Sequence, residues 1–212
     1  MKRAAIALLA AGLVIATGLV ATASSKTTSD PSTGSGAHSF IRWDLPQFVG
    51  NVVLAGGTDV STDAKTGDTI ELTGSGQTEP AEEEAAGGGT FVHMSKSGEV
   101  RAQGAYQVID FISWKRLSGG SLSGTGLIDA IGNGTGAHPN EREETSGVLK
   151  LRVRFIPVVS GTPQPGVNGV LIINCHLPGT AVFVQEGVQV KIPSFDLNFK
   201  ETSGFTLFHA LR

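Results

Sequence analysis

The stretch VLKLRVRFI at Val148–Ile156 alternates apolar and basic side chains along its whole length. Successive side chains of a strand point to opposite faces, so this pattern predicts a half-buried antiparallel strand. The buried face would carry Leu149, Leu151, Val153 and Phe155, and the solvated face Lys150, Arg152 and Arg154.

Similar short apolar runs lie on both sides of this stretch, separated by glycines or charged turns. The expected strands are Phe48–Leu54, Thr69–Thr73, Thr90–Met94, Val100–Trp114, Val170–His176, Val182–Ile192, Phe195–Phe199 and Phe205–Phe208. No credible helix separates them, so parallel pairing, which needs long crossover connections, is not expected. Glu79–Gly88 and Ser118–Ser146 are expected to be long loops.

These patterns predict an all-β fold, a single antiparallel β-barrel over residues 39–212, with a β-sandwich as the alternative. Glycine favours the barrel: the chain has 29 among 212 residues, close to twice the usual share of about 7%. Gly74, Gly104 and Gly187 fall inside strand patterns, which is typical of sharply coiled strands at barrel corners.

The N-terminus has the pattern of a cleavable signal peptide over residues 1–23. Lys2-Arg3 precedes the uncharged stretch Ala4–Val20, and Ala21-Thr22-Ala23 offers a small-x-small cleavage site. A retained membrane anchor is the alternative, because the uncharged stretch approaches a bilayer's thickness. Residues 24–38 are expected to be a flexible polar linker. We therefore expect a secreted, periplasmic or extracellular protein with no stable membrane insertion after cleavage.

Composition excludes several classes of function. The formal net charge of −3 excludes a nucleic-acid binder that works by bulk charge. Cys175 is the single cysteine, so no intramolecular disulfide forms, and its apolar strand predicts a buried, inert thiol. No His or Cys cluster has metal-ligand spacing, so no metal site or other cofactor is predicted. The oligomeric state and the use of the sequon at Asn133 stay open.

Two resemblances extend this interpretation. GDTIELTGSG (Gly67–Gly76), GGGTFVH (Gly87–His93) and GEVRAQG (Gly98–Gly104) resemble a group of secreted microbial proteins with no assigned function, and Leu149–Phe155 and Gly204–Phe208 extend that likeness over most of the chain. The recurring rhythm of Gly-x-Gly followed by a strand is similar to the barrels of the allene oxide cyclase and dirigent group. This second resemblance implies a barrel and no activity.

His93 is the candidate catalytic residue. It shares one face of its expected strand with Phe91, so it would point into a barrel lumen and act there as a general base. Asp110, between Ile109 and Phe111, is the candidate buried carboxylate that would assist it. The alternative for His93 is a hydrogen-bonded position at the mouth or surface, and for Asp110 an outward-facing position on a strand.

Four aromatic residues are the candidate ligand-binding set, with plain core packing as the alternative: Phe91, Tyr106, Phe111 and Trp114. The leading hypothesis is a secreted β-barrel-like protein, not visibly catalytic, that binds a small apolar or carbohydrate ligand or a surface partner. One rival is a lumen-based enzyme, an isomerase, cyclase or hydrolase that uses His93 with a carboxylate. The other is a structural module of the cell envelope tethered by residues 24–38.

Overall fold

The computed structural model describes residues 40–131 and 142–211, all within the compact unit Gly36–Arg212. The expected signal peptide, the linker and the Asn133 sequon lie outside the described residues. In the described ranges the helical structure is one 3-10 turn, η1 (Pro193–Phe195). No helix in those ranges has the length and apolar character needed to cross a membrane.

The other secondary-structure elements are all strands, as predicted, and turns or irregular segments connect them. The strands are β1 (Phe40–Asp44), β2 (Pro46–Val49), β3 (Val52–Ala55), β4 (Asp59–Asp63), β5 (Thr69–Leu72), β6 (Ser75–Glu79), β7 (Glu84–Met94), β8 (Val100–Leu117), β9 (Ile128–Asp129), β10 (Arg142–Val159), β11 (Thr162–Pro163), β12 (Val167–Cys175), β13 (Gly187–Ile192), β14 (Leu197–Ser203) and β15 (Leu207–Leu211).

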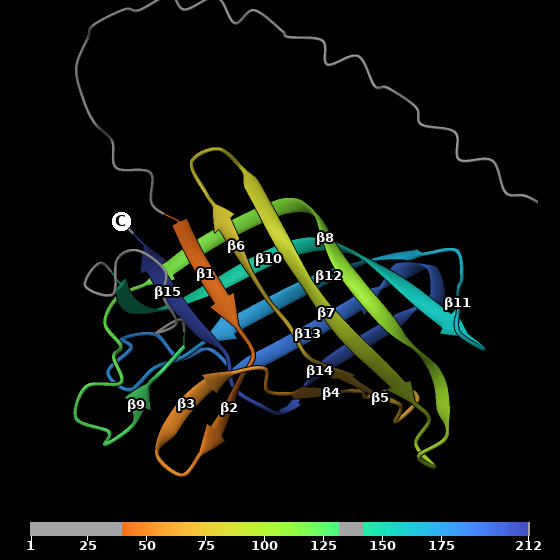
Figure 1. Cartoon of the computed structure of the whole chain (residues 1–212), viewed down its shortest axis with the longest axis horizontal. Coiled ribbons are helices and arrows are strands. Elements are labelled where there is room, and N and C mark those ends of the chain that lie inside the picture. Colours follow the sequence, from red (N-terminus) through yellow and green to blue (C-terminus); the bar gives the residue numbers. More distant parts are fainter. Residues whose placement is uncertain (1–39, 132–141, 212) are drawn as a thin grey trace, which may run out of the picture. The chain divides into compact units, whose positions relative to one another are not determined.

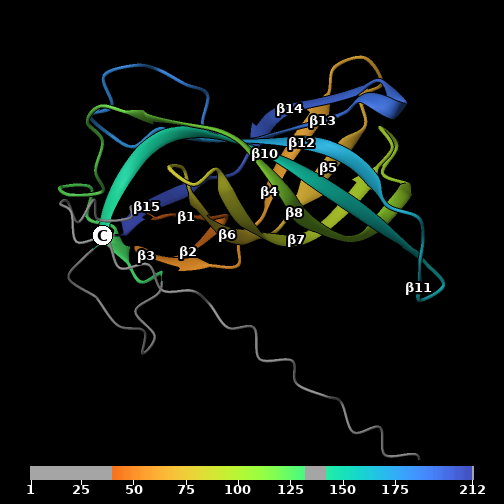
Figure 2. The ribbon, with the colours of Figure 1, turned by 90° about the horizontal axis from the view of Figure 1, so that it is seen from above.

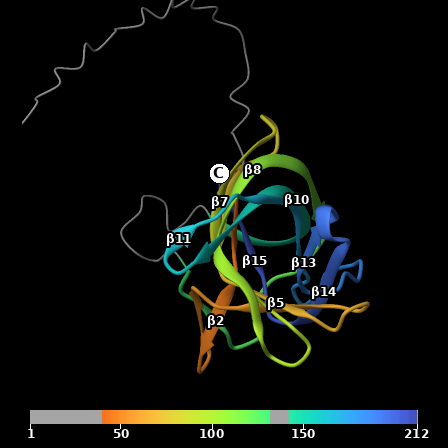
Figure 3. The same ribbon diagram turned by 90° about the vertical axis from the view of Figure 1, so that its right-hand side faces the viewer.

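The main sheet closes into a ring of antiparallel strands. The long strands β8 and β10 pair side by side from Leu117↔Ser146 to Gly104↔Pro157 (Figure 1). From β10 the sheet continues through β12, β13, β14, β4, β5 and β7, and β7 pairs again with β8. Figure 3 shows these strands around a common interior. The predicted antiparallel all-β fold is confirmed, and both a barrel and a sandwich fit this ring.

Two of the long strands change partners along their length. β7 pairs with β5 near its end and with β6 near its start, while β10 pairs with β12 and, at its start, with β15. β1 pairs with both β6 and β15. These three strands form a second branch of the sheet, which lies at the start of β10 (Figure 2). The separate small sheet of β2, β3 and β9 completes the fold. Its strands β3 and β9 pair in parallel, contrary to the expectation from the sequence, because the long chain between them supplies the crossover that parallel strands need.

The ring interior forms the hydrophobic core. The alternation predicted for β10 is confirmed: Leu149, Leu151, Val153 and Phe155 are at most 2% exposed, whereas Lys150, Arg152 and Arg154 face outward. Cys175 is also buried. Full burial of one such apolar side chain stabilises the fold by about 1.5–3 kcal/mol.

Several predicted bounds are wrong. The expected loop Ser118–Ser146 contains β9 and the start of β10, and the strand expected over Val182–Ile192 begins only at Gly187. Most of the expected loop Glu79–Gly88 is strand, because β6 ends at Glu79 and β7 begins at Glu84. Consecutive glycines give this part of β7 little apolar signal, although its backbone pairs regularly with β6. The single strand expected over Phe48–Leu54 is the hairpin of β2 and β3, which turns at Gly50, where φ is +63°.

Gly104 of β8 lies against the backbone of β10 at Ile156 and Pro157. A Cβ atom at this position would stand 2.1 Å from the carbonyl oxygen of Ile156, well inside van der Waals contact. The approach explains why glycine interrupts an otherwise good strand sequence.

We expect Gly104→Ala to lower the free energy of unfolding by roughly 1–3 kcal/mol, because the added methyl group forces the two backbones apart. Urea denaturation of the purified protein measures this change. Gln103→Ala, at an exposed neighbouring position of β8, is the control and should stay within about 0.5 kcal/mol of the wild type. Equal stability of Gly104→Ala and Gln103→Ala would contradict the close approach.

Candidate functional site

A cavity of about 410 Å³ opens at one end of the strand ring, and we call it the mouth cavity. Its lining residues stand at or beside the ends of β5, β7, β8, β10, β12, β13 and β14. Its walls are mainly apolar and comprise Ile70, Phe91, Phe155, Val167, Ile192 and Leu197. This end of the ring therefore offers an apolar space that the core side chains leave unfilled.

Aromatic packing fixes one wall of the mouth cavity. The rings of Phe91 and Phe155 meet edge to face with centroids 5.2 Å apart, and both side chains are almost fully buried. Across the cavity, the turn between β13 and β14 contributes Phe195, which is 63% exposed. The cavity thus has a rigid inner wall and an apolar rim.

Asp68, His93 and Arg101 form the polar cluster of the mouth cavity. Oδ2 of Asp68 lies 3.1 Å from Nε2 of His93 and 2.9 Å from Nε of Arg101. Oδ1 of Asp68 accepts a hydrogen bond from the backbone N–H of Lys96 at 3.3 Å. Since the side chain of Asp68 is only 6% exposed, these groups stabilise a carboxylate that has little contact with water.

The register of β5 against β7 brings His93 to this cluster. His93 pairs with Ile70 across the β5–β7 ladder, which places it close to Asp68 just before β5. Its ring packs edge-on against Phe199 of β14, with centroids 5.4 Å apart. Nε2 is directed at Asp68, and Nδ1 has no hydrogen-bond partner among residues 40–131 and 142–211. The imidazole is therefore held in one orientation by Asp68, and Nδ1 is its unengaged nitrogen among the described residues.

The structure does not bring the two predicted catalytic residues together. His93 lines the mouth cavity, as the mouth alternative anticipated, and its carboxylate partner is Asp68. Asp110 lines a different pocket, and its Oδ2 lies 3.3 Å from Nε of Arg152, with both side chains about half exposed. The pairing of His93 with Asp110 is thus corrected to His93 with Asp68, and Asp110 takes its alternative, outward-facing position.

The four predicted aromatic residues are also dispersed, and of this set Phe91 alone lines the mouth cavity. Tyr106 is 2% exposed, and its hydroxyl donates a hydrogen bond to the carbonyl oxygen of Thr73. Trp114 packs edge-on against Phe208 with centroids 4.8 Å apart. Phe111 lines the pocket that also contains Asp110.

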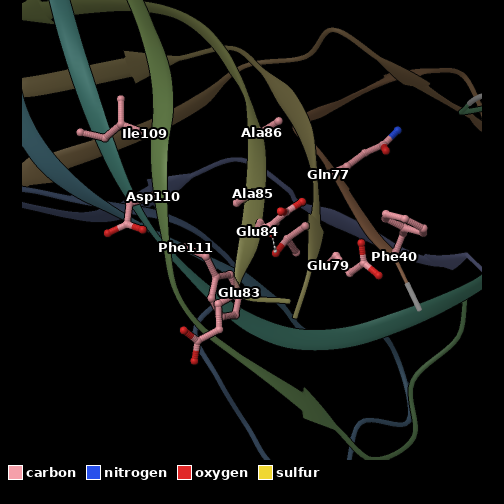
Figure 4. A pocket seen from close by; sticks show the side chains of 11 residues that line it. Phe40, Gln77, Glu79, Glu83, Glu84, Ala85, Ala86, Ile109, Asp110 and Phe111 are labelled. Atoms are coloured by element: carbon pink, nitrogen blue, oxygen red, sulfur yellow. Dashed lines mark hydrogen bonds between the residues drawn. The ribbon is translucent and has the colours of Figure 1, made fainter. Parts of the chain in front are cut away.

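That second pocket has a volume of about 380 Å³ and an acidic lining. Figure 4 shows its side chains, which come from β6, β7, β8, the start of β1 and the turn before β7. Its carboxylates belong to Glu79, Glu83, Glu84 and Asp110. Because Glu83, Glu84 and Asp110 are exposed to solvent, they are well hydrated without a ligand. The mouth cavity, with the nearly buried carboxylate of Asp68 in its polar cluster and with apolar walls, is the stronger candidate site.

A buried carboxyl pair, Asp59 and Glu201, lies elsewhere in the ring and was not anticipated from the sequence. Asp59 is fully buried and Glu201 is 8% exposed, and the backbone N–H of Val188 donates to both at 3.2 and 3.1 Å. Burial, followed by the contact with Glu201, raises the pKa of Asp59 to about 10, and burial also raises the pKa of Glu201. The pair therefore holds a proton at neutral pH.

This proton makes folding stability depend on pH. The pKa of Asp59 is about 10 in the folded protein, whereas an aspartate in an unfolded chain titrates near about 3.9. Between these values the folded state holds a proton that the unfolded chain releases, so stability falls as pH rises. We expect Asp59→Asn, which has no proton to release, to be more stable than the wild type at about pH 9 and less sensitive to pH.

Urea denaturation between about pH 5 and pH 9 measures this difference. Asp110→Asn is the matched control, because the carboxylate of Asp110 is about half exposed, and its curve should run parallel to that of the wild type. A wild-type slope retained in Asp59→Asn would show that the pair is not protonated in the folded protein.

Among the described residues, no three or more His, Cys, Asp or Glu side chains form a group that could hold a metal ion. Comparison of the chain with protein-family models, curated proteins and solved structures found no match. The resemblances noted in the sequence therefore stay expectations, and the case for function rests on the geometry of the mouth cavity.

Proposed function

We propose that this protein binds a small apolar ligand in the mouth cavity. The observation that carries the proposal is an apolar cavity of about 410 Å³ with a few convergent polar groups at the end of a closed strand ring. Ligand pockets of roughly 300–1,000 Å³ with such linings are common at the mouths of β-barrels. We also propose that the protein acts outside the cytoplasm, since residues 1–23 have the pattern of a signal peptide.

The wall chemistry favours an apolar ligand over a carbohydrate. A bound sugar needs hydrogen-bond partners for its many hydroxyl groups, because each unsatisfied buried hydroxyl is costly. In the mouth cavity Asp68 is already bonded to His93 and paired with Arg101. Contact of an apolar ligand with the aliphatic and aromatic walls, by contrast, stabilises the complex by about 25 cal/mol for each Å² of apolar surface removed from water.

Filling the cavity tests the proposal. Ala102 lines it next to His93 in the sheet, so Ala102→Phe should occupy the space a ligand needs. We expect the neutral fluorescent probe N-phenyl-1-naphthylamine to bind the wild type and to bind Ala102→Phe at least tenfold more weakly. Fluorescence titration measures both dissociation constants.

Ala85→Phe is the matched control, because Ala85 lines the acidic pocket instead. It should bind the probe as the wild type does. Unchanged binding by Ala102→Phe, or loss of binding in Ala85→Phe alone, would place the ligand site elsewhere.

A hydrolase is the second candidate function, favoured by the contact between His93 and Asp68. With Nε2 held by Asp68, Nδ1 of His93 would take a proton from water as the hydroxide adds to an ester carbonyl. The tetrahedral intermediate would then break its bond to the alcohol oxygen, and the protonated His93 would return the proton to that oxygen, so that the alcohol and the acid are released. If the protein is a hydrolase, the wild type should hydrolyse p-nitrophenyl decanoate and His93→Gln should not. His176 lines another pocket, so the control variant His176→Gln should keep the activity. Absence of hydrolysis by the wild type excludes this activity for that ester.

A further inference from the structure

We infer that the ligand of the mouth cavity is a carboxylate amphiphile, with its apolar chain against the cavity walls and its carboxylate bound by Arg101. The inference rests on the proposed function, since it concerns the same cavity, and it names the chemical class of the ligand. Among the polar groups of the cavity, Asp68 is already engaged and Arg101 keeps donors for a ligand.

Asp68 has little capacity left for a ligand. Its Oδ2 is shared by Nε2 of His93 and Nε of Arg101, and its Oδ1 accepts from the backbone N–H of Lys96. A carboxylate has about four lone-pair sites. Two of them accept the hydrogen bonds from His93 and Lys96, and the ion pair with Arg101 occupies the space beside Oδ2. Asp68 therefore acts as an anchor that holds His93 and Arg101 at the cavity.

Arg101, by contrast, keeps free donors. Nε faces Asp68, and neither Nη atom donates a hydrogen bond anywhere in residues 40–131 and 142–211. The side chain is 54% exposed, so its free end is accessible from the entrance. A guanidinium group stays charged at every physiological pH, and its planar edge matches a carboxylate through two parallel hydrogen bonds. An anchored arginine of this kind is a preformed carboxylate receptor.

The position of Arg101 gives the ligand its polarity. Arg101 stands at the start of β8, on the rim, whereas Phe91 and Phe155 form the buried inner wall. A ligand that satisfies both regions has one apolar end and one anionic end. A cationic head group would face Arg101 without an unoccupied carboxylate to receive it, and a purely apolar ligand would make no use of the two Nη donors.

Displacement of N-phenyl-1-naphthylamine by matched ten-carbon compounds tests the inference. We expect decanoate to displace the probe from the wild type about tenfold more strongly than methyl decanoate, since the ester lacks the charge that strengthens hydrogen bonds to arginine. Decylamine should be weaker than decanoate. Arg101→Gln should remove the preference for the acid, and Arg101→Lys, which keeps the charge but not the planar fork, should retain part of it.

Arg152→Gln is the matched control. Arg152 is also about half exposed and paired with an aspartate, but it lies away from the mouth cavity, so this variant should keep the full preference for decanoate. Equal displacement by decanoate and its ester, or an undiminished acid preference in Arg101→Gln, would overturn the carboxylate inference and leave apolar binding in place. Failure of the wild type to bind the probe at all would overturn the proposed function instead.

Discussion

The structure depends on the pairing of β4 with β14, which joins the N-terminal and C-terminal strands of the ring. Backbone N–H and C=O groups of buried strands need partners, and this pairing supplies them for both strands. Asp63 at the end of β4 secures the junction, because its carboxylate accepts hydrogen bonds from the backbone of Asn198, Lys65 and Thr66. Burial opposes the charge on Asp63, yet these donors lower its pKa. The same bonds shape the turn that ends at Asp68, so ring closure and site geometry have a common origin.

The two ends of the long strands are filled differently, which explains where the cavity lies. Toward β1 and β15 the interior holds Trp43, which is fully buried, and Phe208, which packs against Trp114. Gly76 and Gly87 leave room for the indole of Trp43, since a Cβ at either position would lie within about 3 Å of it. The opposite end has no tryptophan: both tryptophans of the chain, Trp43 and Trp114, lie away from the mouth cavity. Its walls of Phe91, Phe155 and Ile192 leave the mouth cavity unfilled.

The sequence predicts the fold class well because period-two alternation is a local signal, and β10 from Val148 to Ile156 follows it residue by residue. It predicts His93 as a candidate because a histidine between apolar neighbours is visible in one strand. It does not predict Asp68 as the partner, because the contact depends on the register of β5 against β7 across 25 positions of sequence. The turn Thr66-Gly67-Asp68 before a strand was the available signal. The carboxyl pair of Asp59 and Glu201 needs the closure of β4 on β14, which no local pattern encodes.

A crystal structure of the protein grown with decanoate tests the central claim most directly. The account predicts an extended chain of density between Phe91, Phe155 and Ile192, with the carboxylate at the Nη atoms of Arg101. Asp68 should remain on Nε of Arg101 and on His93. A ring whose end is filled by its own side chains, or decanoate bound only outside the ring, would contradict the account.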